Sequence, residues 1–453
     1  MIMNSTNNEI LPQGYRMTEL GPLPEEWEVV RLGEVAEKMK AGGTPRRSVK
    51  EYWGGNIPFV LIEDMTSCNL YLSKTKETIT EEGLNSSSAW LVPPNTILLS
   101  MYATIGETAI NTIPVTTNQA ILAIIPKDNF DTVFGAYILK YNDQRLIMQN
   151  IQSTQKNVNK GIVDNFKIPL PPLPEQQKIA AVLSAVQEAK EKTQAVIDAT
   201  KVLKKSMMKH LFTYGPVPPE ETENVPLKET EIGKVPEDWE VEKLGDLSTK
   251  KLIKVQFGFP CGKWNDKGIG IAQVRPFNIN ENGNIDLTVL KYIETDNDIG
   301  KYLLQKEDII FNNTNSEELV GKTAFWKDGK IKYVLSNHMT IIRIVDKSKL
   351  NAYFLAKYLH KRWNDGFYKT ICRRHVNQSS ISLARLNDIS LPLPPLPVQQ
   401  KIASILSAID AKIEAEENKK QALEELFKTL LHNLMTAKIR VDKHRINIKE
   451  HKL

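Results

Sequence analysis

Two long stretches of the chain carry apolar residues at intervals of three and four, with no proline or glycine in between. The first runs from 175 to about 212 and the second from 398 to about 438. This heptad-like spacing predicts two long α-helices, each with one apolar stripe. The stripes comprise Ile179, Val182, Val186, Val196, Leu203 and Met207 in the first stretch, and Ile402, Ile405, Ile409, Ile413, Leu423, Phe427, Leu430 and Leu434 in the second.

A lone helix of this kind would leave its apolar stripe in water. At about 38–40 residues, each helix would be about 57–60 Å long. Because the two stripes are alike, we expect the helices to pair with each other. The chain must return across a whole domain between them, which favours an antiparallel pair. The alternative is that each helix packs only on its own neighbouring domain.

The stretches between the helices contain short β-type apolar runs, separated by turn signals such as Gly42-Gly43-Thr44-Pro45 and Glu281-Asn282-Gly283-Asn284. This mixture predicts an α/β fold of the mixed α+β type. The strands that we expect cover residues 57–62, 96–100 and 120–125 in the first stretch, and 270–274, 308–311 and 339–345 in the second.

Two phrases of the sequence occur twice. Residues 168–180 read IPLPPLPEQQKIA and residues 391–403 read LPLPPLPVQQKIA, and each phrase leads into a predicted helix. Residues 18–34 read TELGPLPEEWEVVRLGE and residues 230–246 read TEIGKVPEDWEVEKLGD. The regions between the phrases barely match, so the repeat indicates one frame that holds two different domains. We expect the proline-rich phrases to be extended and polyproline-like, and Trp27 and Trp239 to anchor the two cores.

The repeat predicts an organisation with an internal pseudo-twofold. The length of 453 residues allows about three domains. We predict a first globular domain over 18–170, a first long helix with a proline-rich start over 171–215, a linker over 216–229, a second globular domain over 230–392, a second long helix with a proline-rich start over 393–440, and a basic C-terminal tail over 441–453.

Composition narrows the class of protein only slightly. Apolar residues make up 41% and charged residues 25%, which is typical of a globular protein. The net charge of +5 permits a polyanionic partner without requiring one. Cys68, Cys261 and Cys372 have no spacing suited to zinc or to a disulfide framework. With no signal-like N-terminus and no apolar run near 18 residues, we predict a cytoplasmic protein without a membrane span.

The candidate chemistry is that of contact with a polyanion. Arginine and lysine match guanine edges, and asparagine and glutamine match adenine edges. Amide-rich and basic tracts directly precede the proline-rich phrase in both halves, at 152–160 and 373–380. The alternative is that these tracts are ordinary loops. The candidate DNA-binding residues are Arg46, Arg47, Lys50, Tyr102, Thr104, Lys156, Asn157 and Asn159 in the first domain, and Lys254, Arg275, Asn278, Asn313, Asn315, Arg373, Arg374, His375, Asn377 and Gln378 in the second.

The sequence contains no recognisable catalytic constellation. Gly321-Lys322-Thr323 resembles the end of a phosphate-binding loop, but Ser316 stands where the earlier glycine is needed. The seven histidines have no metal-ligand spacing. We therefore predict no catalytic residue, no metal site and no cofactor on this chain.

The order of these motifs resembles the specificity subunit of type I restriction–modification systems, over nearly the whole chain. The resemblance rests on the doubled PLPPLP-x-QQ-K-I-A, each copy followed by Leu-Ser-Ala at 183–185 and 406–408, and on the Pro-x-x-Trp phrases from Pro24 and Pro236. One departure is Val398, where the family has a glutamate like Glu175. We expect this change to affect the capping of the second helix.

The resemblance implies a division of labour. Each globular domain would be a target recognition domain that reads one half of a bipartite, asymmetric target in double-stranded DNA. The antiparallel two-helix coiled coil would hold the domains at a set spacing. Two modification subunits carrying S-adenosylmethionine would methylate adenine, and restriction/translocase subunits using ATP and Mg²⁺ would join them. The residues alone leave two alternatives, an adaptor that binds only proteins and a self-contained nuclease.

Overall fold

The computed structural model describes residues 11–102, 104–148, 158–260, 263–329 and 331–441. The chain forms two compact units. Unit 1 comprises Met1–Ala195 and Glu417–Leu453, and unit 2 comprises Val196–Glu416. Each unit therefore contains one globular domain together with part of each long helix. Within the described ranges, no helix is both long and apolar enough to cross a bilayer.

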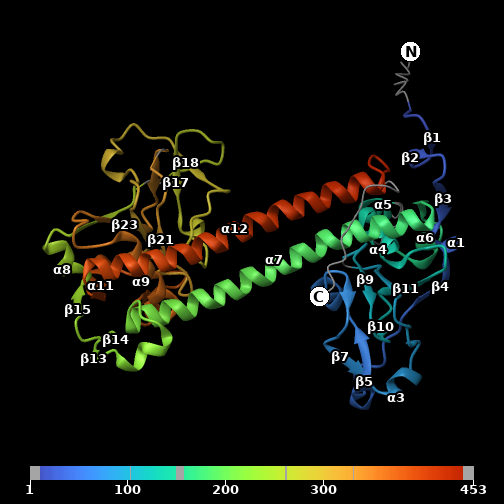
Figure 1. Cartoon of the computed structure of the whole chain (residues 1–453), viewed down its shortest axis with the longest axis horizontal. Coiled ribbons are helices and arrows are strands. Elements are labelled where there is room, and N and C mark those ends of the chain that lie inside the picture. The colour runs from blue at the N-terminus through green and yellow to red at the C-terminus, as the bar shows by residue number, and fades with distance from the viewer. Residues whose placement is uncertain (1–10, 103, 149–157, 261–262, 330, 442–453) are drawn as a thin grey trace. The chain divides into compact units, whose positions relative to one another are not determined.

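The two long helices are α7 (Leu173–Tyr214) and α12 (Leu396–Met435), close to the predicted stretches. Both run without a break from one unit into the other (Figure 1). Helix α7 ends at Gly215, which has a φ of 83° and donates its N–H to the Leu211 carbonyl. A left-handed residue after the last turn is typical of a glycine-ended helix.

The antiparallel pairing of the helices is confirmed within each unit. In unit 1, Ile179 and Leu183 near the start of α7 share a core with Phe427 and Leu434 near the end of α12. In unit 2, Met208 and Leu211 near the end of α7 share a core with Ile402 and Leu406 near the start of α12. The start of each helix thus lies beside the end of the other.

The first domain stacks a large sheet on a small one. The large sheet has the order β4 (Ala36–Ala41), β11 (Ile121–Pro126), β8 (Ile97–Ser100), β9 (Thr108–Asn111), β6 (Tyr71–Leu72). The small sheet has the order β10 (Thr116–Thr117), β5 (Trp53–Val60), β7 (Glu77–Ile79). Short helices connect them: α1 (Leu32–Val35), η1 (Lys50–Tyr52), α2 (Ile62–Ser67), α3 (Glu81–Asn85), α5 (Asp143–Met148) and α6 (Lys160–Asp164).

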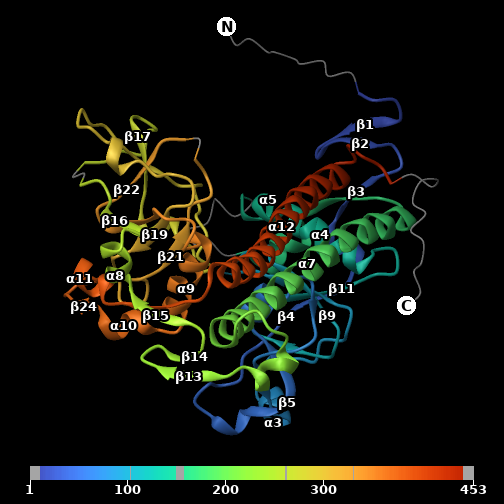
Figure 2. The ribbon, with the colours of Figure 1, turned by 60° about the vertical axis from the view of Figure 1, so that its left-hand side comes forward.

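Helix α4 (Thr132–Tyr141) joins the large sheet to the long helices. Thr108 of β9 donates a hydrogen bond to the Ala136 carbonyl at 3.2 Å, and the Tyr137 ring meets the Phe427 ring edge-on at 5.8 Å. The small sheet lies on the other side of the large sheet from the long helices (Figures 1 and 2).

The second domain repeats this layering. Its large sheet has the order β16 (Ile253–Phe257), β23 (Met339–Ile344), β19 (Ile309–Asn312), β21 (Thr323–Phe325), and its small sheet has the order β18 (Lys291–Ile293), β17 (Ile271–Val274), β22 (Tyr333–Leu335). Helix α9 (Ala352–Asn364) takes the place of α4. A third sheet has the order β20 (Thr314–Asn315), β25 (Ser379–Ser380), β24 (Arg373–Arg374). The short helices are η2 (Pro219–Asn224), α8 (Leu244–Thr249), η3 (Pro276–Asn278), η4 (Gly300–Tyr302), α10 (Phe367–Ile371) and α11 (Leu383–Asn387).

The two domains therefore share one topology although their sequences barely match. Strands β4, β11, β8 and β9 correspond in order to β16, β23, β19 and β21. The small sheets also agree, because β10 pairs parallel with β5 just as β22 pairs parallel with β17. Each inner strand is apolar where it faces another layer, and this pattern, rather than residue identity, is what the two domains have in common.

Each domain is closed at its base by a two-stranded ribbon. Strand β3 (Glu28–Arg31) pairs antiparallel with β12 (Lys167–Leu170), and β15 (Glu240–Lys243) pairs with β26 (Ser390–Leu393). The first three residues of each proline-rich phrase are thus extended, but they form paired strands rather than free polyproline, and the last prolines, Pro174 and Pro397, already lie in the first turn of α7 and α12. A ribbon tolerates proline because its outer edges need no N–H donor. Two hairpins precede the ribbons: β1 (Tyr15–Thr18) with β2 (Gly21–Pro24), and β13 (Leu227–Thr230) with β14 (Gly233–Pro236).

The doubled glutamine phrase ties each domain to its helix. The buried Gln176 side chain accepts from the backbone N–H of Asp131, the N-cap of α4, at 2.9 Å, and donates to the Asn129 carbonyl at 3.0 Å. Gln399 does the same in unit 2, accepting from Asn351 at 2.9 Å and donating to Lys349 at 3.0 Å. The repeated phrase therefore sets the position of α4 and α9 relative to the frame.

The segment after α12 is bound to the start of α7 in unit 1. Glu175 accepts from Trp27 Nε1 at 3.0 Å and from Arg440 Nη2 at 2.8 Å. Tyr15 donates to the Ala437 carbonyl at 2.6 Å. The hydrogen bond to Glu175 is the main reason why the pKa of Arg440 is raised. Trp27 and Trp239 are both buried in the cores, as predicted.

Val398 replaces the Glu175 carboxylate in unit 2 and packs against the apolar core. The start of the helix is unchanged by this replacement. Gln399 donates its backbone N–H to the Pro395 carbonyl at 3.1 Å, as Gln176 does to Pro172 at 3.1 Å. The departure from the family pattern therefore removes an ion pair and leaves the capping of α12 intact.

A buried ionic cluster joins α7, α12 and α9 in unit 2. Asp410 lies 2.7 Å from Lys204 Nζ and 2.6 Å from Lys357 Nζ, and it accepts from Tyr353 Oη at 2.5 Å. Burial alone would raise the pKa of Asp410, but the two ammonium groups outweigh burial and lower this pKa to about 2. Burial lowers the pKa of Lys357 to about 8.

Unit 1 fills the corresponding place with uncharged side chains. When the doubled phrases are aligned, Phe427 is equivalent to Lys204 and Gln187 is equivalent to Asp410. When α4 and α9 are aligned at their N-caps, Tyr137 is equivalent to Lys357. Tyr137 and Phe427 form the ring contact described above. The same junction is therefore ionic in unit 2 and aromatic in unit 1.

His360 should make unit 2 sensitive to acid. This side chain is 1% exposed, its Nε2 lies 3.1 Å from the Glu281 carbonyl, and burial lowers its pKa to about 3. The unfolded chain, with an ordinary histidine pKa of about 6.5, binds the proton first, so stability is lost as pH falls from about 6.5 towards 3. At pH 4.5 we expect a loss of about 2–3 kcal/mol in the free energy of unfolding.

This loss is measured by urea denaturation at pH 7 and at pH 4.5, with hydrogen exchange of α9 as the readout. His360→Gln keeps an N–H donor and cannot take up the proton, so it should flatten the pH dependence. An equally steep dependence in His360→Gln would assign the acid sensitivity to other groups.

Candidate nucleic-acid interface

The loops at one end of the large sheet converge in the first domain. Gly42 donates its N–H to the Ile121 carbonyl at 3.2 Å, and Gly43 donates to Thr117 at 2.9 Å. Met101 donates to Ala120 at 2.8 Å and accepts from Val158 at 3.2 Å. We call residues 42–50, 101–102, 104, 117–120 and 158–159 the first loop cluster.

The same four hydrogen bonds recur in the second domain. Gly258 donates to Met339 at 2.9 Å, and Phe259 donates to Leu335 at 2.7 Å. Asn313 donates to His338 at 3.1 Å and accepts from Ile381 at 2.9 Å. We call residues 258–260, 313–316, 336–338 and 373–381 the second loop cluster. The two domains thus present different side chains from one arrangement of loops.

A glycine is required where each cluster begins. A Cβ on Gly42 would lie 1.9 Å from the Thr117 carbonyl oxygen, and a Cβ on Gly258 would lie 2.0 Å from that of Ser336. This close approach lets the loop after β4 cross over the segment that leads into β11. In the second domain, the loop after β16 crosses the segment that leads into β23 in the same way. Glycine here is therefore part of the architecture that positions both clusters.

The predicted residues of the first domain lie on or beside the first loop cluster. Arg46, Arg47, Lys50, Tyr102 and Thr104 are all exposed. Arg47 stacks on the Trp53 ring at 3.9 Å and pairs with Glu77 at 2.7 Å. Asn159 is exposed and caps α6, while Lys156 and Asn157 lie outside the described residues.

Sequence reasoning missed a second basic group in this domain. Lys38 and Lys40 are exposed on β4, with their ammonium groups 4.5 Å and 5.5 Å from the centre of the Trp90 ring. The sequence signal that could have identified them is the alternation of polar and apolar residues along a strand, since Met39, the residue between the two lysines, is buried. Thr44 and Gln119 were missed as well, and they meet at 2.6 Å within the cluster.

The predicted residues of the second domain fall into two groups. Arg373, Arg374, His375, Asn377 and Gln378 are exposed on the β24–β25 hairpin. Asn315 lies beside them on β20, which pairs with β25. Of the basic and amide residues predicted for the second domain, the largest group therefore lies together on this hairpin and on β20.

The remaining predicted residues have other surroundings. Asn278 is buried and donates to the Asp286 and Val289 carbonyls at 2.7 Å and 2.8 Å, so it shapes a loop. Asn313 is buried and accepts from Thr340 at 3.0 Å, so it supports the cluster from below.

Lys254 and Arg275 lie nearer the solvent. Lys254 is exposed on β16 at the position that corresponds to Lys38 on β4, because both stand opposite the fifth residue of the neighbouring strand. Arg275 directly follows β17. It lies next to Ser336 of the second loop cluster, because the Ser336 N–H donates to the carbonyl of the preceding residue, Val274, at 2.9 Å.

The Gly321-Lys322-Thr323 segment does not bind phosphate in the way its sequence suggests. Lys322 is buried, and its ammonium group donates to the Ile279 carbonyl. Burial lowers the pKa of Lys322. In the described part of the chain, no three His, Cys, Asp or Glu side chains gather as a metal-binding group.

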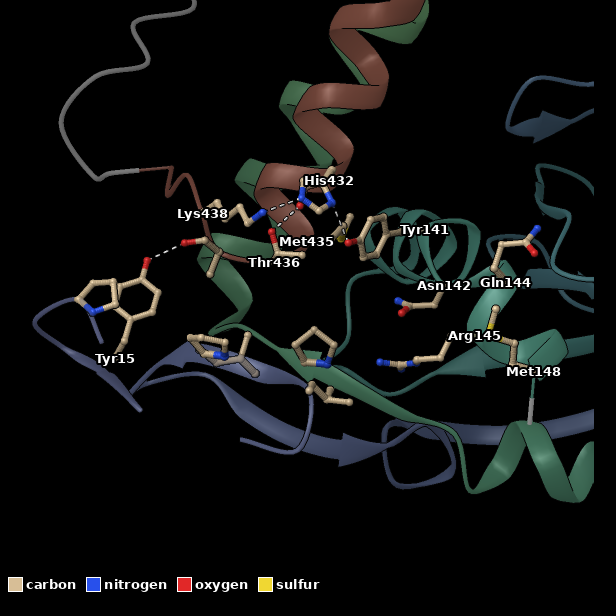
Figure 3. A pocket seen from close by; sticks show the side chains of 16 residues that line it. Tyr15, Tyr141, Asn142, Gln144, Arg145, Met148, His432, Met435, Thr436 and Lys438 are labelled. Carbon is tan, nitrogen blue, oxygen red and sulfur yellow. Dashed lines mark hydrogen bonds between the residues drawn. The ribbon is translucent and has the colours of Figure 1, made fainter. Parts of the chain in front are cut away.

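A cavity of about 1070 Å³ lies in unit 1, between the β1–β2 hairpin, α5 and the end of α12 (Figure 3). On one wall, His432 Nδ1 lies 3.0 Å from Tyr141 Oη, and His432 Nε2 lies 3.0 Å from Lys438 Nζ. The frame and α5 line this cavity, and no residue of the first loop cluster does. We therefore do not count it among the candidate DNA contacts.

Comparisons with known proteins agree with this architecture. A family model described as the type I restriction modification DNA specificity domain matches residues 24–199 and 236–425. The type I restriction enzyme MjaIX specificity subunit of Methanocaldococcus jannaschii is 27% identical, over 94% of this chain and 97% of the relative. The MjaVIII specificity subunit of the same organism is 28% identical, over 92% and 94%. The crystal structure of a type I restriction-modification S subunit from M. genitalium has a TM-score of 0.58 at 15% identity, covering 90% and 96%.

Proposed function

Because the chain belongs to the family defined by the type I restriction modification DNA specificity domain, which it carries twice, we propose that it directs a type I restriction–modification enzyme to its DNA target. The observation that carries the proposal is the pair of loop clusters. The same backbone hydrogen bonds hold both, while the side chains that they present differ. Two such readers on one chain suit a bipartite target with dissimilar halves, one half for each domain.

The helices suit the role of a spacer. Each begins in one unit and ends in the other without a proline or glycine in its interior, and a continuous helix has a fixed rise per residue. We propose that α7 and α12 set the number of unread base pairs between the half-sites. Phosphate contacts from exposed basic residues such as Lys38, Lys40 and Lys254 would add affinity without sequence preference.

We further propose that the chain has no chemistry of its own and recruits it. The frame occurs twice, with the ribbon of β3 and β12 at the start of α7 matched by the ribbon of β15 and β26 at the start of α12. A partner that binds the frame of one unit meets a similar surface on the other, which favours two modification subunits. S-adenosylmethionine would be held by these subunits, and ATP and Mg²⁺ by the restriction subunits. The complex would act in the cytoplasm.

Methylome sequencing tests the proposed function. Cells that express this chain with its modification partner should carry methylated adenine in both halves of one bipartite motif, and cells without the chain should not. DNA binding by the complex should weaken steeply with salt. An adaptor for proteins alone would give no sequence-dependent DNA binding, and a self-contained nuclease would cut DNA without partners.

Exchanging one domain should change one half-site only. The ribbon of β3 and β12 pairs Arg31 with Lys167, so residues 32–166 can be replaced by the corresponding segment of the MjaIX relative at adjacent points. We expect one half of the methylated motif to change, with the gap and the other half kept. The reciprocal exchange of residues 244–389 serves as the control and should change the other half. A change in both halves after either exchange would contradict modular reading.

A further inference from the structure

The tip of the β24–β25 hairpin displays a fully exposed apolar side chain. Val376 is 99% exposed. Four residues, His375 to Gln378, connect the two strands, and the loop is closed by the His375 N–H donating to the Gln378 carbonyl at 2.8 Å. An apolar side chain this exposed leaves nearly its whole surface available for burial against a partner, and that burial would be favourable.

The hairpin is held firmly at its base. Ser379 and Ile381 are buried, and Ile381 donates its N–H to the Asn313 carbonyl. Strand β20 pairs with the edge of β25 that is not paired with β24. Arg374 pairs with Glu317 at 2.5 Å. The tip is therefore presented in one orientation by a supported ribbon.

The residues around Val376 have the chemistry of base-edge readers. The side chains of Arg373, Asn377 and Gln378 are exposed and make no hydrogen bond to any residue that the structure describes. Amide side chains match the adenine edge, arginine matches the guanine edge, and a small apolar group matches the methyl group of thymine. The major groove is wide enough to admit a two-stranded ribbon.

We propose that this hairpin enters the major groove of the half-site read by the second domain, and that Val376 recognises the C5-methyl group of a thymine there. The inference rests on the proposed function and adds to it a base and a residue that reads it. Among the four unmodified bases, only thymine carries a methyl group in the major groove. Asn377 or Gln378, next to Val376, then reads a neighbouring base.

Uracil substitution tests this proposal directly, because deoxyuridine differs from thymidine only by the missing methyl group. Once the methylome has defined the target, the reconstituted methyltransferase is assayed for binding to duplexes in which each thymine is replaced singly by uracil. At one thymine of the second half-site, we expect uracil to weaken binding by about 3- to 10-fold. Val376→Ala should weaken binding of the thymine duplex by a similar factor and show no further loss with uracil at that position.

Val345→Ala is the matched control, since Val345 is 59% exposed in the same unit and lies outside the second loop cluster. It should leave binding unchanged. Full binding by Val376→Ala, additive losses with uracil at every thymine, or a second half-site without thymine would each overturn the proposal. If Val376→Ala weakened binding while the wild-type complex lost no affinity with uracil at any thymine of the second half-site, Val376 would act as a wedge between base steps, which would overturn it too. Failure of the proposed function is a different result, in which the wild-type complex shows no sequence-specific binding.

Discussion

Inserting seven residues into α7 after Ala195 and seven into α12 after Glu416 is expected to end methylation of the original target. The two insertion points lie at the boundary between the units in both helices. Seven residues add about 10.5 Å of helix, which corresponds to about three base pairs of duplex at 3.4 Å each. Specific binding commonly exceeds non-specific binding by a factor of about 10³–10⁷, so the loss at the original site should be of that order.

The insertion also changes the rotation between the half-sites. A heptad returns a coiled-coil stripe to nearly the same face, whereas about three base pairs turn the DNA by roughly a third of a helical turn. We therefore expect either a new motif with a gap about three base pairs longer or no specific binding. Methylome sequencing distinguishes the two, and both support the helices as spacer.

Seven residues inserted into the linker at Pro219–Asn224, which follows α7, form the control. This insertion lengthens the chain outside the helical pair and should leave the motif unchanged. If the double helix insertion kept both the original gap and the original affinity, α7 and α12 would not set the spacing.

Replacing Asp410 by leucine is expected to lower the free energy of unfolding of unit 2 by about 3–5 kcal/mol. The carboxylate is the common partner of the Lys204 and Lys357 ammonium groups, and all three side chains are buried. Leucine would leave two positive charges close together with no counter-ion, and an unpaired buried charge costs more than the pair itself contributes. Urea denaturation of the full chain, with hydrogen exchange of α9 as the readout, measures the loss.

Unit 1 supplies the control for this experiment. The triple variant Lys204→Phe, Asp410→Gln, Lys357→Tyr copies the residues of the corresponding junction, Phe427, Gln187 and Tyr137. It removes the charges together, so we expect it to recover most of the stability that Asp410→Leu loses. A triple variant as unstable as Asp410→Leu would show that the charge of the cluster is not what matters.

Periodicity was enough to predict the two long helices and several of the inner strands, whereas α4 and α9 were not predicted. The expected strand at 96–100 is β8 (Ile97–Ser100), and the one at 339–345 is β23 (Met339–Ile344). The long helices agree with prediction to within a few residues because their stripes are long and uninterrupted. Pairing between distant strands was not predicted, because the ribbon of β3 and β12 depends on a contact that neither local sequence encodes.

The candidate interface was predictable in composition and not in geometry. The basic and amide tract at 373–380 was singled out by its composition, and its residues 373–378 are exposed; the hairpin that they form was not predicted. In sequence, Asn278 and Asn313 cannot be told apart from the exposed asparagines, yet their side chains form hydrogen bonds inside the domain. The difference arises from the sheet order, which decides which loops meet and which polar groups are covered.

The contacts that Tyr15 and Arg440 make place both ends of the described part of the chain in unit 1. Joining residues 11 and 441 through a short peptide and reopening the chain in the linker at Pro219–Asn224 would give a circular permutant with every contact of the frame retained. Such a protein would begin with the second domain and end with α7. The order in which a gene encodes the two readers is thus separable from the target that they specify.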